Sequence, residues 1–253
     1  MYMAQYSEYI LSGYGSDIST HFPTPIKIDT ERYDAKIGLK SFVTYNNIAN
    51  IIDNVNNCIK VLTPDYEDYI ICRIETGSYE IEQISVAIQR FINKKRPSLK
   101  KVDEAFRIEG NESTSKAEIV IEKAGYAVDF DCEASICKIL GFDKHDKFEN
   151  TGRYVARKIV DIISVTHLVV NTNVVESNYI NEQLAPYLYA CSLDSPPGYR
   201  IQREIANICY KKLITNQISF LRCWLTDQHS DIVDLRGDEL LIVLSIKLTP
   251  KSV

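Results

Sequence analysis

Asp227, His229 and Asp231 alternate along a short polar segment, and their side chains are of the kinds that bind metal ions or move protons. Two carboxylates beside an imidazole can ligate a divalent cation or serve as general acid and base. Asp side chains in polar segments also accept hydrogen bonds from nearby backbone N–H groups and thereby stabilise tight turns. We expect these residues to cap the turn of a hairpin between the last two predicted strands.

A second group of carboxylates, Asp129, Asp131 and Glu133, also alternates. Alternate residues of a β-strand share one face, so these side chains could offer oxygen ligands to a calcium ion at a junction between subunits. A solvent-exposed strand face explains the same pattern. The sequence leaves the calcium hypothesis open.

The histidine and cysteine residues give weaker indications of a functional site. His167 lies in the apolar run 162–170, which favours a core or interface residue over a pH sensor. The seven cysteines, an odd number, lie mostly in apolar strand patterns and are expected to be reduced and buried. Cys132 and Cys137 have no second Cys or His pair at the spacing of a zinc site.

The sequence contains none of three common catalytic patterns. It has no Gly-rich phosphate loop after a strand, no Gly-x-Ser-x-Gly turn, and no Cys beside a helix start with an evident His partner. We therefore expect no catalytic, cofactor-binding or metal-binding residues, and no enzymatic activity.

The chain of 253 residues has a net charge of −5. This acidic balance gives no reason to expect contact with a phosphate backbone, so direct nucleic-acid binding is not expected. The basic cluster at residues 94–101 follows a helical pattern and is interpreted as a solvated loop. We find neither a signal peptide nor a membrane-spanning run, which favours synthesis in a reducing compartment.

Residues 1–22 are rich in Tyr, Ser and Gly and show no sustained period, which predicts a flexible amino-terminal arm. The arm contains Tyr2, Tyr6, Tyr9 and Tyr14. Tyrosine suits protein interfaces, because its ring buries a large area while its hydroxyl stays hydrated. The arm is either a contact to a neighbouring subunit or a tail with incidental aromatic residues.

Alternating apolar and polar residues predict strands after the arm. The predicted strands are residues 35–45, 57–62, 69–76, 105–109, 116–122, 126–131, 165–173, 186–192, 217–227 and 238–248. Helical spacing predicts a helix over residues 79–95, and a second short helix over 134–141 ends at Gly141. The strands between these helices are expected to form a meander, and residues 145–157 the longest surface loop.

The last two predicted strands are expected to form a hairpin-like pair. In the first, Ile218, Phe220 and Trp224 have the same parity and are assigned to the core face. In the second, one face carries Leu240, Ile242, Leu244, Ile246 and Leu248.

The fold class predicted from these elements is all-β, a single jelly-roll β-sandwich with two short inserted helices. Eight or more antiparallel strands with helices in the connections are typical of a jelly roll. Because no linker composition divides the chain, residues 23–253 are assigned to one domain.

Short motifs follow one another in a fixed order over about residues 33–248. They are 77–84 (GSYEIEQI), 126–130 (YAVDF), 139–142 (ILGF), 164–170 (SVTHLVV), 187–189 (YLY), 197–199 (PGY), 224–228 (WLTDQ) and 237–247 (GDELLIVLSIK). In this order they resemble the penton-like minor capsid proteins of Maverick/Polinton elements, adintoviruses and virophages. The arm and residues 143–157 match nothing in that family.

The resemblance implies a structural virion protein without catalytic motifs. It implies a single jelly-roll vertex (penton) subunit of an icosahedral capsid, made in the host cytoplasm, which forms a homopentamer beside capsomers of a double jelly-roll major capsid protein. The alternative is a jelly-roll binding module that recognises a carbohydrate or a receptor. A closed ring of subunits would favour the first, and a monomer with a polar-aromatic pocket the second.

Overall fold

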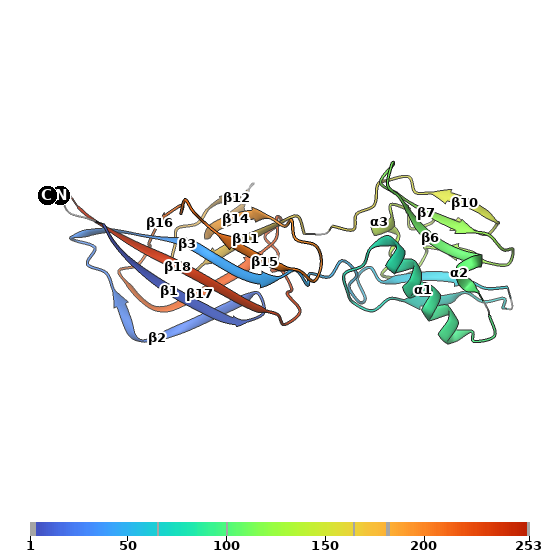
Figure 1. Cartoon of the computed structure of the whole chain (residues 1–253), viewed down its shortest axis with the longest axis horizontal. Helices are drawn as coiled ribbons and strands as arrows, with labels where there is room; N and C mark the ends of the chain where they lie inside the picture. Colours follow the sequence, from blue (N-terminus) through green and yellow to red (C-terminus); the bar gives the residue numbers. More distant parts are fainter. Residues whose placement is uncertain (1–3, 65, 100, 164, 181–182, 252–253) are drawn as a thin grey trace. The chain divides into compact units, whose positions relative to one another are not determined.

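The computed structural model describes the whole chain except residues 1–3, 65, 100, 164, 181–182 and 252–253 (Figure 1). It consists of two compact units, where the sequence predicted one domain over residues 23–253. Unit 1 comprises residues 1–48 and 165–253, and unit 2 comprises residues 49–164. Unit 2 is therefore an insertion in the sequence of unit 1. No composition change marks its boundaries, because both units are built from strands with the same apolar alternation.

Unit 1 contains two antiparallel sheets. The first has the order β1 (Gln5–Tyr14), β18 (Glu239–Pro250), β3 (Tyr33–Tyr45) and β15 (Arg200–Glu204), and β16 (Lys211–Lys212) also pairs with β3. The second has the order β14 (Tyr187–Ser192), β11 (His167–Thr172), β17 (Gln217–Thr226) and β2 (Asp17–Lys27). A separate hairpin joins β12 (Asn178–Ile180) to β13 (Gln183–Ala185).

The strand order of unit 1 is that of a jelly roll. Counted along the chain, its eight main strands lie in the order first, eighth, third, sixth in one sheet and fifth, fourth, seventh, second in the other. Eight antiparallel strands in two sheets joined by Greek-key connections define this fold. The predicted all-β jelly roll is confirmed.

One hydrophobic core joins the two sheets of unit 1. Phe42 of β3, Leu168 of β11 and Leu225 of β17 are fully buried in the same cluster. β18 contributes one face, as predicted: Leu240, Ile242, Leu244 and Ile246 are at most 3% exposed.

The expected hairpin of the last two strands is wrong. β18 pairs with β1 and β3, whereas β17 pairs with β11 and β2 in the opposite sheet. The polar connection between them therefore passes from one sheet of the sandwich to the other. Alternation in a strand specifies its faces but not its partner, so the sequence could not reveal this crossing.

The predicted core face of β17 is also wrong in part. Its pairing with β2 shifts register between Ile218 and Phe220. An irregularity of this kind reverses which parity faces the core. Ile218 is buried as expected, but beyond the shift Leu221 and Leu225 are buried, and Trp224 lies half-buried on the other face.

The predicted flexible arm differs from the structure from Gln5 onward. β1 pairs with β18 along its whole length, and β2 pairs with β17. The absence of an apolar period has a structural cause: β1 is the outer strand of its sheet, and Leu11 is its one buried side chain. Tyr2 lies outside the described residues.

Unit 2 contains two antiparallel sheets and three helices. The sheets have the orders β10 (Gly152–Val155), β7 (Lys116–Ile121), β6 (Phe106–Asn111) and β5 (Ile70–Arg73), β4 (Cys58–Leu62), β8 (Ala127–Asp129), β9 (Lys147–Phe148). The helices are α1 (Ile81–Lys95), α2 (Val102–Ala105) and α3 (Cys137–Leu140).

The predicted helix over residues 79–95 is confirmed as α1. Glu80 and Gln83 form a capping box at its start, and Lys94 and Lys95 lie in its last turn. These features suit the helix dipole and the free N–H groups of the first turn. The face formed by Ile81, Ile84, Ile88 and Ile92 is buried in the core of unit 2.

The second predicted helix is present as the shorter α3, which ends at Gly141 in a left-handed conformation with φ +79°. The expected meander is wrong, since β6 and β7 form a hairpin but β8 pairs with β4 in the other sheet. The expected loop at 145–157 contains β9 and β10.

Candidate functional site

The Asp227 segment forms a capped turn, as predicted, but the two strands that it connects do not form the expected hairpin. Asp227 Oδ1 accepts hydrogen bonds from the backbone N–H groups of His229 (2.8 Å) and Asp231 (3.0 Å). The backbone N–H of Asp227 donates to the carbonyl of Asp231 at 2.9 Å. The imidazole of His229 is exposed. These contacts give the cluster a local structural role.

The three alternating carboxylates do not share a strand face. β8 ends at Asp129, whose Oδ1 accepts a hydrogen bond from the backbone N–H of Asp131 at 2.7 Å. Asp131 faces His145, with 3.9 Å between carboxylate oxygen and Nδ1. Within the described residues, no group of three or more His, Cys, Asp or Glu side chains is placed to hold a metal ion. The geometric basis of the calcium hypothesis is therefore absent from this part of the chain.

His167 is exposed at the start of β11, where a core or interface residue was expected. Its Nδ1 lies 3.0 Å from Thr166 Oγ1. The apolar run that contains it is not one continuous strand, because β11 begins only at His167.

The seven cysteines are free thiols, and five of them are buried. Burial raises the pKa of Cys72 and that of Cys223 to about 12, so both thiols are protonated at neutral pH. Cys209 is the exposed member of the set. A buried protonated thiol is a poor nucleophile, which agrees with a packing role for these two residues.

The outer strand of the jelly roll carries an exposed apolar row. Tyr6, Ile10 and Tyr14 of β1 have the same parity and are 58%, 68% and 81% exposed. Lys247 lies beside the row, with its Nζ 5.8 Å from the ring centroid of Tyr6. Glu8 and Ser12 lie between Tyr6, Ile10 and Tyr14 on the same exposed face. A long outer strand that exposes large aromatic and aliphatic side chains is a surface that folded proteins normally cover with a partner. We define these three residues as the β1 row.

The tyrosine content of the amino-terminal segment was the signal that pointed to the β1 row. The residues predicted to form an interface, Tyr6 and Tyr14 among them, therefore lie in strand β1 and not in a flexible arm. Ile10 was missed because its neighbours in sequence showed no period.

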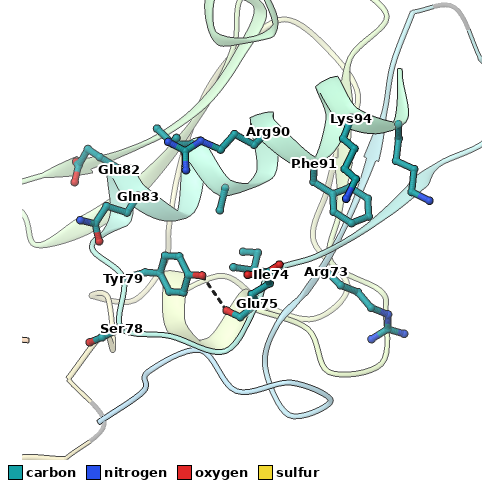
Figure 2. Close-up of a pocket in the computed structure, with 13 residues that line it drawn as sticks. Arg73, Ile74, Glu75, Ser78, Tyr79, Glu82, Gln83, Arg90, Phe91 and Lys94 are labelled. Carbon is teal, nitrogen blue, oxygen red and sulfur yellow. Dashed lines mark hydrogen bonds between the residues drawn. The ribbon is translucent and has the colours of Figure 1, made fainter. Parts of the chain in front are cut away.

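Unit 2 carries a groove of about 900 Å³ between α1 and the chain that follows β5 (Figure 2). In Figure 2, Arg90, Phe91 and Lys94 extend from α1, and Arg73, Ile74 and Glu75 lie across from them. The hydroxyl of Tyr79 donates a hydrogen bond to the backbone carbonyl of Glu75 at 3.0 Å, which fixes one side of the groove. We define this as the α1 groove.

The α1 groove could not be predicted from the sequence. Lys94 belongs to the basic cluster that was interpreted as a solvated loop. Arg73 is the last residue of strand β5, and only the packing of helix α1 against β5 brings Arg73 and Lys94 to one surface.

In the part of the chain that the structure describes, no helix is both long enough and apolar enough to cross a membrane.

No protein-family model matches this chain, and no curated protein sequence does. Among solved structures, its fold is similar to the crystal structure of the mavirus penton protein. The similarity has a TM-score of 0.50 and covers 98% of this chain and 100% of the mavirus protein, at 9% sequence identity. At so low an identity the likeness establishes a shared penton-like fold.

Proposed function

We propose that this chain is a structural capsid protein, the vertex subunit of an icosahedral shell, which assembles as a homopentamer beside a major capsid protein. The observation that carries the proposal is the fold: a jelly roll with an inserted unit, similar over 98% of the chain to a viral penton protein. The virion is accordingly its proposed location, after synthesis in the host cytoplasm.

The β1 row supports assembly through unit 1, the jelly roll. A contact between two different surfaces of identical subunits repeats from copy to copy and closes as a ring when the rotation fits. Tyr6, Ile10 and Tyr14 provide one such surface, because aromatic and aliphatic side chains dominate the buried centres of protein interfaces. The open edge of β1 adds backbone groups that a neighbour can pair with.

Mass photometry of the purified chain, alone and with its major capsid protein, tests the proposal. We expect a species of about five times the subunit mass of 28.9 kDa. Replacing the β1 row with serine (Tyr6→Ser, Ile10→Ser, Tyr14→Ser) is expected to shift the distribution to the monomer. A matched variant, Val55→Ser with Ile232→Ser, removes exposed apolar side chains elsewhere and should leave the pentamer intact.

A monomer at every concentration and salt, also in the presence of the major capsid protein, would overturn the vertex role. A stable trimer would also contradict it. If the variant with the three serine replacements still forms a pentamer, the vertex role stands, but the β1 row is not part of the interface between subunits.

A further inference from the structure

The α1 groove concentrates positive charge on a chain whose net charge is −5. Its lining includes four cationic side chains, Arg73, Arg90, Lys94 and Lys95, and two carboxylates, Glu75 and Glu82. Among the described residues, neither Arg90 nor Lys94 forms an ion pair. Cations that have no internal partner are available to an anionic ligand.

Apolar side chains lie between the cations. Val86 is 41% exposed, and Ala87 and Phe91 are half-buried beside it on α1. The Nζ of Lys95 is 5.9 Å from the ring centroid of Phe91. A ligand that fits this lining needs carboxylates together with at least one apolar group.

The backbone beside the groove favours an extended ligand. β5 is the outer strand of its sheet, and the N–H of Ile74 donates to the carbonyl of Asn57 on the β4 side at 2.9 Å. In an antiparallel strand the neighbouring residue directs its backbone groups the opposite way, so Arg73 presents them to the open edge. An outer strand of this kind can pair with an added peptide segment.

We propose that the α1 groove binds an extended acidic segment of a partner protein. Acidic side chains of that segment meet Arg73, Arg90 and Lys94, and an apolar side chain covers Val86 and Phe91. This binding site goes beyond the proposed vertex role and does not depend on it.

The charge distribution favours a peptide over a nucleic acid. Glu75 and Glu82 line the same groove as the cations, so a continuous phosphate backbone would meet two like charges. A peptide can place carboxylates at the cations and a neutral or basic side chain near the two glutamates.

The test uses the full chain and a fluorescein-labelled peptide of about 12 residues with the repeat Glu-Ser-Phe-Ser, which places Glu and Phe on the same face of an extended chain. Fluorescence anisotropy should show saturable binding that weakens as salt rises. Replacing both exposed cations of α1 (R90E with K94E) should weaken binding at least about tenfold. The matched variant K138E with K144E reverses two exposed lysines elsewhere in unit 2 and should bind as the original chain does.

A second variant separates packing from charge. Val86→Ser keeps every cation, and the proposal expects it to weaken binding without changing the salt dependence. Far-UV circular dichroism should be unchanged in all variants, because the replaced side chains are exposed.

Absence of binding, or equal binding by the R90E/K94E variant and the original chain, would overturn the proposal. Tighter binding of a single-stranded DNA oligonucleotide than of the peptide would assign the groove to nucleic acid instead. A loss of self-association in the R90E/K94E variant without peptide would assign the groove to a second copy of the chain. The oligomer test of the vertex role uses the original chain and the β1-row variant, so its result does not depend on whether the peptide binds.

Discussion

The guanidinium of Arg222 donates two hydrogen bonds to the carboxylate of Asp17, one of them from Nε to Oδ1 at 2.8 Å. The two residues are 205 positions apart in sequence and lie on the paired strands β2 and β17. Bidentate pairs of this kind combine charge with fixed geometry. The pair therefore joins the beginning of the chain to its seventh jelly-roll strand.

Asp17→Asn should lower stability by no more than about 1 kcal/mol at pH 7, because both side chains are partly exposed. The hydrogen bonds from Arg222 hold the pKa of Asp17 below its ordinary value of 3.8. A carboxylate with a lowered pKa stabilises the fold above its unfolded pKa, and this contribution is lost as the pH falls through the folded pKa. The difference between variant and original chain should therefore shrink below about pH 3.8 in urea unfolding curves.

Asp103→Asn is the control for this measurement, because Asp103 is exposed on α2. A difference between Asp17→Asn and the original chain that stays constant down to about pH 2 would contradict the role of the ion pair.

Leu225→Ala should destabilise the chain more than Trp224→Ala does, although tryptophan is larger. Leu225 is fully buried between the sheets, and its loss should cost about 2–5 kcal/mol. Trp224 is half-buried on the other face, where the guanidinium carbon of Arg222 lies 4.9 Å from its ring centroid, and its loss should cost about 1–2 kcal/mol. Chemical denaturation measures both losses of stability. A larger loss for Trp224→Ala than for Leu225→Ala would mean that Trp224 faces the core, as the sequence alone predicted.

Gly141→Ala should be strongly destabilising. The residue has φ +79°, and an added Cβ would lie 2.3 Å from the backbone oxygen of Lys158. The left-handed conformation alone costs about 1–2 kcal/mol, and the clash adds to it. Gly198→Ala is the matched control, because its φ is +81° but nothing lies within 4 Å of the added Cβ. Equal melting temperatures for the two variants would show that the Lys158 contact yields without cost.

Cys209 should be the fastest thiol to react with Ellman's reagent in the native chain. It is exposed, whereas Cys72 and Cys223 are fully buried and have their pKa raised to about 12. Cys209→Ser should remove the fast phase, and the buried thiols should react only after unfolding. If Cys72 or Cys223 reacts quickly at pH 8, the corresponding core opens far more readily than its packing indicates.

The sequence correctly predicted those features that depend only on residues close together in the chain. The buried face of β18 follows from alternation, α1 follows from helical spacing and its capping residues, and the end of α3 follows from Gly141. The polar turn at Asp227 was predicted for the same reason, since its hydrogen bonds are made within the segment.

Features that depend on distant partners were missed. β1 shows no period because one edge and one face of it are exposed, and its strand character depends on β18 at the other end of the chain. The parity of β17 changes where it pairs with β2. The β1 row was predicted only through its tyrosines, and the α1 groove requires two elements that meet in the fold.

The position of β18 between β1 and β3 has a consequence for biosynthesis. β18 lies between β1 and β3 and pairs with both, so the first sheet lacks one of its inner strands until residues 239–250 have left the ribosome. Unit 2, by contrast, is complete in sequence at residue 164. The inserted unit can thus fold during translation, while the jelly roll that flanks it in the sequence must wait until β18 has been made.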